Sequence, residues 1–267
     1  MKHLFCFGFG YTAQHLAARL EASDWKVTGT NRQTFQTLAH IPDDVTHILS
    51  SVPPGPDGDP VVAKFAAGLA RGFEWIGYLS TTGVYGDRAG GEVDEDSPLR
   101  PVSERGHRRL AAEQAWAPFQ PHVFRLPGIY GPGRSQLDAV RDGSARRIVK
   151  PGQVFSRIHV DDIAGVLAAS IARPHPGRPY NVADDQPCPP QDVVAYAAKL
   201  LGVEPPPAVD FDMADLSPMA RSFYGESKRV SNRRIKEELS YSLLYPNYRL
   251  GLEAILSSSP HLRAARG

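Results

Sequence analysis

A strand that runs into a glycine-rich turn and then into a helix constrains this chain more than any other feature. Residues 4–7 are short and apolar, as a fully buried parallel strand should be, and G-F-G-Y-T-A follows at residues 8–13. A helix is predicted over 12–20, because Ala13, Leu16, Ala17 and Leu20 fall on one of its faces. This order predicts a dinucleotide-binding turn rather than a plain strand–helix connection.

Each residue type in the turn suits a bound pyrophosphate. Gly8 permits a tight turn, and Gly10 lets the backbone approach the phosphates. Ala13 stands where a third glycine is usual and is still small enough for close helix–strand packing. The first helical residues, Tyr11 and Thr12, present free N–H groups to the negative charge. We therefore expect these five residues to bind a nicotinamide dinucleotide.

The end of the second predicted strand, over residues 25–30, bears on the choice between NAD and NADP. An NAD enzyme usually places a carboxylate on the adenosine ribose about 20 residues after the turn. This chain instead has Asn31 and Arg32 there, and no acid. A guanidinium at Arg32 suits the 2′-phosphate of NADP, because the two groups can share paired hydrogen bonds. The alternative is a solvated arginine that opens the next helix; we favour NADP.

Strands and helices alternate through the first half of the chain. Further strands are predicted over 45–52, 75–79 and 122–125, and helices up to residue 70 and over 101–116. The alternation predicts an α/β fold of the Rossmann type, a doubly wound parallel sheet with helices on both faces.

The pattern loosens after Gly131, where proline and glycine become frequent. Helices predicted over 160–172 and 191–201 alternate there with short strands such as 178–182. We therefore divide the chain into an NAD(P)-binding Rossmann domain, residues 1–172, and a smaller substrate-binding lobe with the C-terminal segment, residues 173–267. Crossings back from the lobe to the main sheet are expected.

Charge and cysteine content exclude several other classes of protein. The 267 residues carry a formal net charge of +1, which gives no field that favours nucleic acid or a membrane. The two cysteines, Cys6 and Cys188, provide neither a disulfide framework nor a metal site. No stretch is long enough to span a bilayer, and because the first residues lead directly into a predicted strand, we expect no signal peptide. We expect a cytoplasmic protein that acts on a small molecule.

Four further motifs share a family resemblance. They are Y-L-S-T-T-G-V-Y-G at 78–86, R-L-P-G-I-Y-G-P-G-R at 125–134, F-S-R-I-H-V-D-D-I-A at 155–164 and P-Y-N-V-A-D-D at 179–185. Together with the glycine turn they resemble the extended short-chain dehydrogenase/reductase superfamily, specifically the NAD-dependent epimerase/dehydratase group. The resemblance extends from Phe7 to about Leu201.

The resemblance implies roles for several further residues. Thr81 takes the place of the family's catalytic Ser/Thr, whose hydroxyl polarises the reacting oxygen. It also implies a homodimer formed through the helices that follow the third and fourth strands. The residues that it places along the cofactor are Ser50, Ser51, Val52, Ser80, Pro127 and Ile129.

The family's Tyr-x-x-x-Lys pair is missing. Aligning its motif with residues 101–109 puts Arg105 on the tyrosine and Arg109 on the lysine, where Arg109 would still lie beside the cofactor. An arginine does not supply a proton, because its pKa stays above about 12. The Asp-Glu pair of the dehydratases is replaced by Thr82 and Gly83, which argues against a sugar-nucleotide 4,6-dehydratase. The chain therefore resembles an atypical member of the family.

Two basic clusters leave the nature of the substrate open. Arg105, Arg108 and Arg109 would share one helix face and bind an anion there, or lie solvated on the surface. A second cluster comprises Lys228-Arg229 and Arg233-Arg234, and Arg229 is a further candidate for an anionic group. Both clusters together favour a small, polar, anionic substrate.

Three residues are candidates for the missing acid. Tyr85 and Tyr130 belong to V-Y-G and I-Y-G turns, where a packing role is the alternative. His159 titrates in a useful range, and its alternative role is a hydrogen-bonded residue at a helix start. Two functions follow: an NADP-dependent oxidoreductase or epimerase with an atypical active site, or an NADP-binding sensor without turnover.

Overall fold

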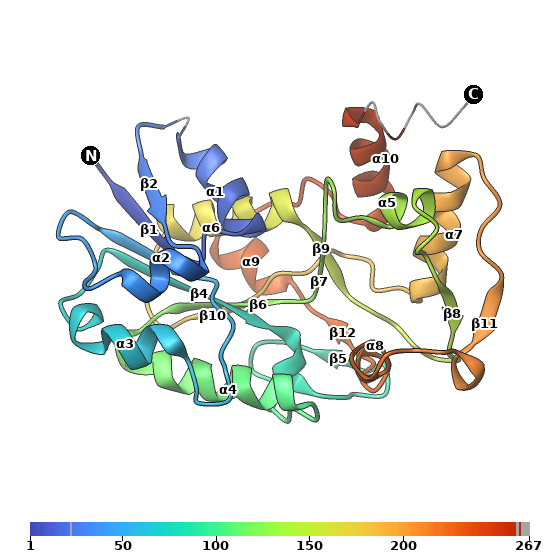
Figure 1. The fold of residues 1–267 in the computed structure, drawn as a ribbon, viewed down its shortest axis with the longest axis horizontal. Coiled ribbons are helices and arrows are strands. Elements are labelled where there is room, and N and C mark those ends of the chain that lie inside the picture. The colour runs from blue at the N-terminus through green and yellow to red at the C-terminus, as the bar shows by residue number, and fades with distance from the viewer. Residues whose placement is uncertain (22, 260–261, 263–267) are drawn as a thin grey trace.

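The computed structural model describes residues 1–21, 23–259 and 262, and a parallel sheet of six strands forms its centre (Figure 1). The strand order is β10-β6-β4-β3-β1-β2, and every neighbouring pair is parallel. The expected doubly wound α/β fold is confirmed. In sheet order the strands are Pro179–Asn181, His122–Leu126, Trp75–Thr81, His47–Ser50, His3–Phe7 and Lys26–Gly29.

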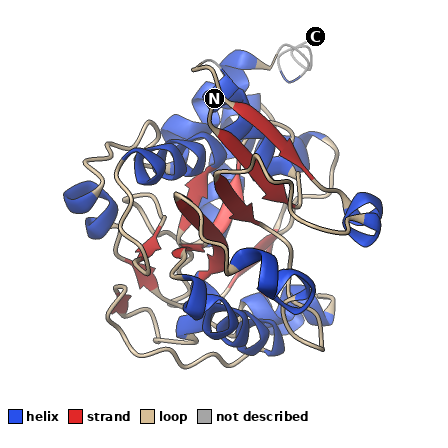
Figure 2. Ribbon diagram, turned by 90° about the vertical axis from the view of Figure 1, so that its left-hand side faces the viewer, coloured by secondary structure: helices blue, strands red, loops and turns tan. Residues whose placement is uncertain are grey.

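Helices cover both faces of the sheet (Figures 1 and 2). On one face α1 (Tyr11–Glu21) and α6 (Val160–Ala172) pack against each other and against the strands. On the other face lie α3 (Pro60–Leu69) and α4 (Glu104–Trp116).

Strand β1 shows why the central strands read as continuous apolar runs. Successive side chains of a strand point to opposite faces. Leu4 and Cys6 therefore enter the core under α1 and α6, while Phe5 and Phe7 enter the core under α3 and α4. Each central strand thus contributes to two hydrophobic cores, which suits a buried parallel sheet.

The order of the first three strands fixes where a ligand can approach. The chain leaves β1 for β2 on one side, and then returns through α2 (Arg32–Thr37) to β3 on the other side of β1. In open α/β sheets, ligands bind at such a reversal, outside the carboxyl ends of the strands. In the described sheet β2 is the edge strand, so the usual further strand beyond it is absent.

The remaining elements form a smaller second part that shares segments with the first. Strands β8 (Arg147–Val149) and β11 (Ala208–Asp210) pair with each other, as do β7 (Gly128–Tyr130) and β9 (Arg157–His159). Strand β10 follows the predicted domain boundary at residue 172 but pairs with the main sheet. Strand β8 precedes that boundary but lies outside the main sheet. The other elements are β5 (Glu92–Val93), β12 (Arg229–Val230), α5 (Gln136–Arg141), α7 (Pro190–Leu201), α8 (Pro218–Phe223), α9 (Arg233–Glu238) and α10 (Tyr248–Ser258).

The long elements begin and end close to where the sequence predicts them, and α6 matches residue for residue. The helix predicted over 101–116 begins later, at Glu104, because the Ser103 side chain caps it by accepting a hydrogen bond from the Gly106 N–H. None of the described helices is long and apolar enough to cross a membrane.

Gly86 tests how tightly the turn after β4 is packed. Its φ is +69°, and a Cβ there would lie 1.9 Å from the Arg100 carbonyl oxygen. Gly143 has a similar φ of +76° but nothing within 4 Å of such a Cβ. We expect Gly143→Ala to lower the free energy of unfolding by about 1 kcal/mol, and Gly86→Ala to lower it by at least about 2 kcal/mol more, measured by urea unfolding. Equal losses would contradict the close contact.

Candidate functional site

The turn after β1 is held by side chains from the strands on both sides of it. The Gly8 N–H donates to Thr30 Oγ1 at 3.2 Å, and Ser51 Oγ donates to the Gly8 carbonyl oxygen at 2.6 Å. Gly8 has a φ of +84°, and a Cβ there would lie 2.7 Å from Ser51 Oγ. Only glycine fits this position without strain. The sequence reasoning missed Thr30, which had only its place at the end of β2 to indicate it.

Gly10 and the start of α1 fit a pyrophosphate. A Cβ on Gly10 would have nothing within 4 Å, so the backbone is open to a ligand there. Helix α1 begins at the next residue, Tyr11, and its first N–H groups have no partner within the helix. The partial positive charge of this helix end favours the phosphates. Tyr11 also donates its hydroxyl to the Pro132 carbonyl oxygen at 3.0 Å.

Ser50, the last residue of β3, and Ser51, the residue after it, differ in burial and contacts. Ser50 is fully buried, so its side chain faces the protein interior rather than a groove. Ser51 is half-buried and stabilises the glycine turn, as described above. Val52 is half-buried as well and lies within 3.4 Å of a Cβ built on Gly8. Ser51 and Val52 therefore border the turn, whereas Ser50 is buried in the sheet.

Asn31 and Arg32 lie at the end of β2, where the adenosine ribose is expected. Asn31 caps α2 by accepting a hydrogen bond from the Thr34 N–H at 2.9 Å. Arg32 is exposed at the first position of that helix, and no ion pair with another described residue is recorded for it. Its guanidinium is available to a phosphate.

The carboxyl end of β4 presents the hydroxyl of Thr81. The Gly83 N–H donates to Thr81 Oγ1 at 3.2 Å and caps the 3-10 helix η1 (Thr82–Tyr85). The Thr81 hydroxyl hydrogen stays available for a substrate oxygen, since Oγ1 only accepts in this contact. Ser80, the preceding residue, is buried and donates to Glu113 Oε1 instead.

The three arginines of α4, which the sequence predicts on one helix face, make different contacts. Arg109 donates to Tyr78 Oη at 3.1 Å and to the Leu79 carbonyl oxygen at 2.8 Å, which ties α4 to β4. Arg108 pairs with Glu104 at 2.9 Å on the surface. Arg105 is exposed and lies 5.6 Å from the centre of the Phe223 ring. The side chains diverge because each reaches a different neighbour.

A buried ion pair supports β4 from below. Arg125 on β6 donates to Glu113 on α4 at 2.8 Å, and both side chains are less than 9% exposed. Arg125 also donates to Tyr85 Oη at 2.9 Å, and Tyr85 donates to Asn181 Oδ1 at 2.7 Å. Burial raises the pKa of Tyr85 to about 12. These contacts favour a packing role for Tyr85.

Tyr130 and His159 lie side by side inside the protein. Their ring centres are 5.1 Å apart, and burial raises the pKa of Tyr130. His159 Nδ1 accepts a hydrogen bond from the Asp161 N–H at 3.2 Å and caps α6. His159 is 1% exposed, and burial lowers its pKa to about 4, so the ring is neutral. Neither titrating group reaches the surface beside Thr81.

The segment after β6 brings a further cation to the glycine turn. Pro127 precedes β7 and Ile129 lies within it, and both are half-buried. Arg134, in the loop after β7, lies 5.8 Å from the centre of the Tyr11 ring at the start of α1. The sequence reasoning passed over Arg134, although it closes the G-P-G-R motif at 131–134.

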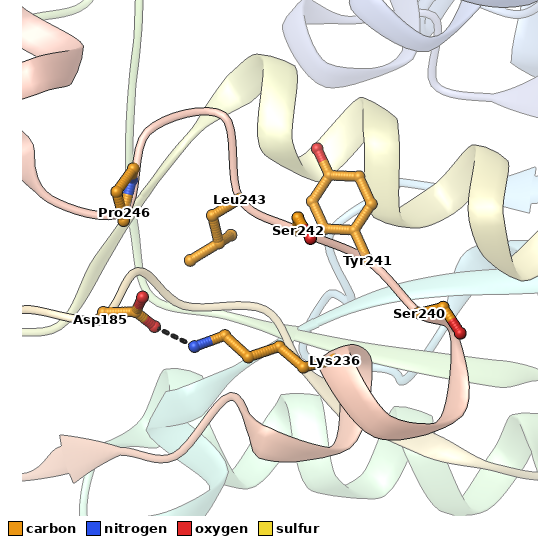
Figure 3. A pocket seen from close by; sticks show the side chains of 7 residues that line it. All are labelled: Asp185, Lys236, Ser240, Tyr241, Ser242, Leu243 and Pro246. Atoms are coloured by element: carbon orange, nitrogen blue, oxygen red, sulfur yellow. Dashed lines mark hydrogen bonds and ion pairs between the residues drawn. The ribbon is translucent and has the colours of Figure 1, made fainter.

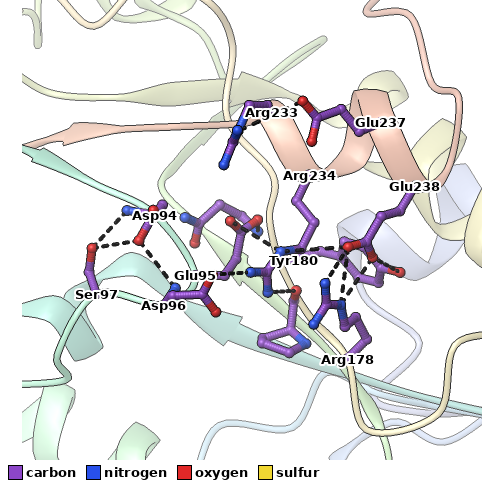
Figure 4. A network of polar contacts seen from close by, with 12 residues as sticks. Asp94, Glu95, Asp96, Ser97, Arg178, Tyr180, Arg233, Arg234, Glu237 and Glu238 are labelled. Atoms are coloured by element: carbon purple, nitrogen blue, oxygen red, sulfur yellow. Dashed lines mark hydrogen bonds and ion pairs between the residues drawn. The ribbon is translucent and has the colours of Figure 1, made fainter.

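The second basic cluster is largely neutralised by acids (Figure 4). Arg234 is buried and pairs with Asp96 at 2.7 Å and with Glu95 at 3.7 Å. Arg233 pairs with Glu237 on the surface. The Arg229 guanidinium donates to the Gly90 carbonyl oxygen. Lys228 pairs with Glu226. This cluster stabilises contacts between α9, β12 and the turn after β5 rather than offering four free cations.

A surface pocket of about 480 Å³ lies away from the glycine turn, beside α9 (Figure 3). Lys236 and Asp185 point toward each other in it and form an ion pair. Tyr241, also in its lining, donates its hydroxyl to Asp162 at 2.9 Å. The polar groups that line this pocket therefore largely form hydrogen bonds and ion pairs within the protein.

Comparison with known proteins identifies relatives along the whole chain. No family model matches the sequence. Protein YeeZ of Escherichia coli (strain K12) is 27% identical over 284 residues, which cover 92% of this chain and 97% of that protein. The 3-diazoavenalumate denitrifying reductase of Streptomyces sp is 28% identical over 187 residues, 60% of this chain and 58% of that protein.

Solved structures with the same fold include proteins of the expected group. A functionally unknown conserved protein from Silicibacter pomeroyi DSS is 54% identical, with a TM-score of 0.90 over 97% of this chain and 99% of that one. A protein from Methylobacillus flagellatus, provisionally described as an NAD-dependent epimerase/dehydratase, is 28% identical, with a TM-score of 0.65 over 96% and 98%. The human epimerase family protein SDR39U1, solved with NADPH, is 17% identical, with a TM-score of 0.79 over 97% and 100%, and shares the fold.

Glu113→Gln tests the ion pair beneath β4. The substitution leaves the buried Arg125 charge without its counter-charge, so we expect the free energy of unfolding at pH 7 to fall by about 3–5 kcal/mol. Glu104→Gln breaks an exposed pair on the same helix and should change it by less than about 0.5 kcal/mol. Similar losses in the two variants would show that the buried pair is not a main support of the strand.

His159→Asn tests the burial of the neutral imidazole, because asparagine still caps a helix. The unfolded chain binds a proton at His159 below about pH 6.5, and the folded chain only below about pH 4. The stabilisation is therefore complete above pH 6.5 and lost as the pH falls to 4. We expect the difference in unfolding free energy between the two proteins to shrink by about 3 kcal/mol from pH 7 to pH 4. A constant difference would contradict the burial.

Proposed function

We propose that this chain, a member of the extended short-chain dehydrogenase/reductase superfamily, is an NADP-dependent oxidoreductase that acts on a small polar substrate. The observation that carries the proposal is the open backbone at Gly10, directly before the N-terminus of α1 and at the reversal of strand order. A pyrophosphate is the group that this combination suits.

The cofactor preference rests on the end of β2. Arg32 is exposed and carries its charge next to the Asn31 cap, where the adenosine ribose would lie. The absence of an acid there removes the repulsion that a 2′-phosphate would meet. Human SDR39U1, which shares the fold, was solved with NADPH.

Thr81 is the residue that we assign to the reacting oxygen. A bound nicotinamide supplies hydride transfer, and the Thr81 hydroxyl donates a hydrogen bond to the carbonyl that accepts it. Tyr85, Tyr130 and His159 are buried, so we assign proton delivery to water in the groove. The Streptomyces relative is named as a reductase, which supports reduction as the direction of the reaction. We further propose the homodimer that the family resemblance implies, to be tested by light scattering.

A second function, NADP binding without turnover, follows from the replacement of the Tyr/Lys pair by Arg105 and Arg109. One experiment distinguishes the two functions. NADPH oxidation in the presence of a panel of aldehydes and ketones supports the oxidoreductase, and tight binding without oxidation across the panel supports the sensor.

Gly10→Val tests the cofactor site without disturbing the fold, because a side chain there meets open space. We expect an unchanged melting temperature and at least 100-fold weaker NADPH binding by calorimetry, since the valine occupies the place of the pyrophosphate. A variant that binds NADPH as tightly as the wild type would exclude this site.

Arg32→Gln tests the 2′-phosphate, with NADH as the control ligand. Loss of a charge-assisted pair predicts about tenfold weaker NADPH binding and unchanged NADH binding. If the wild type binds NADH more tightly than NADPH, the assignment of Arg32 is wrong.

Thr81→Val and Thr81→Ser separate the hydroxyl from the shape of the side chain. Serine keeps the hydrogen bond from the Gly83 N–H and the donor to substrate, whereas valine removes both. We expect the valine variant to lose about 100-fold in kcat and the serine variant to retain most of it. Equal rates in all three proteins would remove Thr81 from the reaction.

A further inference from the structure

Two arginines of α4 and one from the loop after β7 lie around the proposed cofactor site. Arg109 reaches β4 through the Leu79 carbonyl oxygen, and Arg105 lies one turn earlier on α4. Arg134 lies over the Tyr11 ring, because its loop contacts the start of α1 through the Tyr11–Pro132 hydrogen bond. Partial burial, followed by the neighbouring charges of Arg109 and Arg134, lowers the pKa of Arg105, which is consistent with their proximity.

The charge of these arginines is not balanced within the described part of the chain. Arg105, Arg109 and Arg134 form no ion pair with a described residue, whereas Arg108 on the same helix pairs with Glu104. The acid that faces Arg105 is Glu226, and Lys228 already pairs with it. Arg105 is also the second residue of α4, near the positive end of the helix dipole, where a cation is disfavoured. An anion bound there would remove both costs.

Arg105 contacts one exposed apolar side chain, and a second exposed apolar side chain precedes its helix. The Arg105 guanidinium lies 5.6 Å from the centre of the Phe223 ring, and that side chain is 50% exposed. Val102, at the entry to α4, is 60% exposed. An inorganic ion would leave both surfaces in water. An organic ligand covers them while its charged group contacts the arginine.

We propose that Arg105 and Arg134 bind the carboxylate or phosphate of an organic acid, and that Phe223 and Val102 contact the apolar part of that molecule. The inference rests on the proposed function, because it places the acid beside Thr81 in the same groove. Contact between α4 and the Thr81 turn supports this: a Cβ on Gly106 would lie 2.9 Å from the Gly83 carbonyl oxygen. Arg105 thus occupies the position of the family's tyrosine in the sequence, and in this proposal it binds an anion instead of transferring a proton.

The test measures binding of four probes to the protein saturated with NADPH: benzoate, phenyl phosphate, acetate and inorganic phosphate. NADPH affinity is determined first, by calorimetry, and probe binding is then followed by nicotinamide fluorescence. We expect benzoate or phenyl phosphate to bind more tightly than acetate and inorganic phosphate, because only the first two have an apolar part. Tighter binding of phenyl phosphate identifies the group as a phosphate, and tighter binding of benzoate identifies it as a carboxylate.

Charge-matched variants locate the site. Arg105→Gln and Arg134→Gln should each weaken the better aromatic probe at least tenfold, and Arg105→Gln should leave NADPH affinity within twofold. Arg108→Gln, which removes the same charge from a paired arginine, should change neither.

Three results would overturn the inference. The first is NADPH binding with no binding of any probe, which leaves the proposed function intact. The second is equal probe affinity in Arg105→Gln and Arg108→Gln. The third is a loss of NADPH affinity in Arg134→Gln without a loss of probe affinity, which would assign Arg134 to the pyrophosphate. A chain that binds no NADPH overturns the proposed function and this inference together.

Discussion

The turn at Gly8 is the constraint on which the rest of the site depends. Its left-handed backbone carries the chain from β1 into α1, and Thr30 and Ser51 fix it from the two neighbouring strands. Because those strands lie on opposite sides of β1, the turn is fixed at the reversal of strand order. The direction of the first N–H groups of α1 follows from this turn. The packing of α1 against α6 then holds the helix in place.

Binding and acid–base chemistry are separated in this protein. The carboxyl end of β4 carries the Thr81 hydroxyl, and arginines of α4 lie nearby, so these groups are suited to orient a ligand. The residues that could exchange a proton, His159 and Tyr85, are buried inside the protein instead. His159 is neutral because it is buried, and burial raises the pKa of Tyr85 to about 12 although Arg125 donates to its hydroxyl. In the proposed function, the residues of this chain therefore position and polarise a substrate, and the proton comes from solvent.

The sequence predicts the parts of this structure that depend on local pattern. The run at 4–7, the glycine turn and the periodic helix after it predict the first strand–turn–helix unit because each signal lies within a few residues. Alternation of strands and helices likewise predicts the parallel sheet. The paired strands β5, β7, β8, β9, β11 and β12 have two or three residues each, too few for a periodic signal, and their partners are distant in sequence.

The contacts of the arginines show why the site is harder to predict from the sequence than the fold is. Spacing on a helix indicates which residues share a face, but a long side chain pairs with whatever acceptor its tertiary neighbours provide. Arg109 donates to the Leu79 carbonyl oxygen and Arg108 pairs with Glu104, so of the three arginines on α4 only Arg105 has neither a hydrogen bond nor an ion pair with a described residue. Arg134 comes from a loop that contacts the start of α1, and no local pattern connects residues 105 and 134.

The most direct test of the account is a crystal structure of the protein with NADPH. The account predicts that the pyrophosphate oxygens accept hydrogen bonds from the backbone N–H groups at Tyr11 and Thr12, with the nicotinamide beside Thr81 and the 2′-phosphate at Arg32. NADPH bound anywhere else, including the pocket beside Lys236, would contradict it.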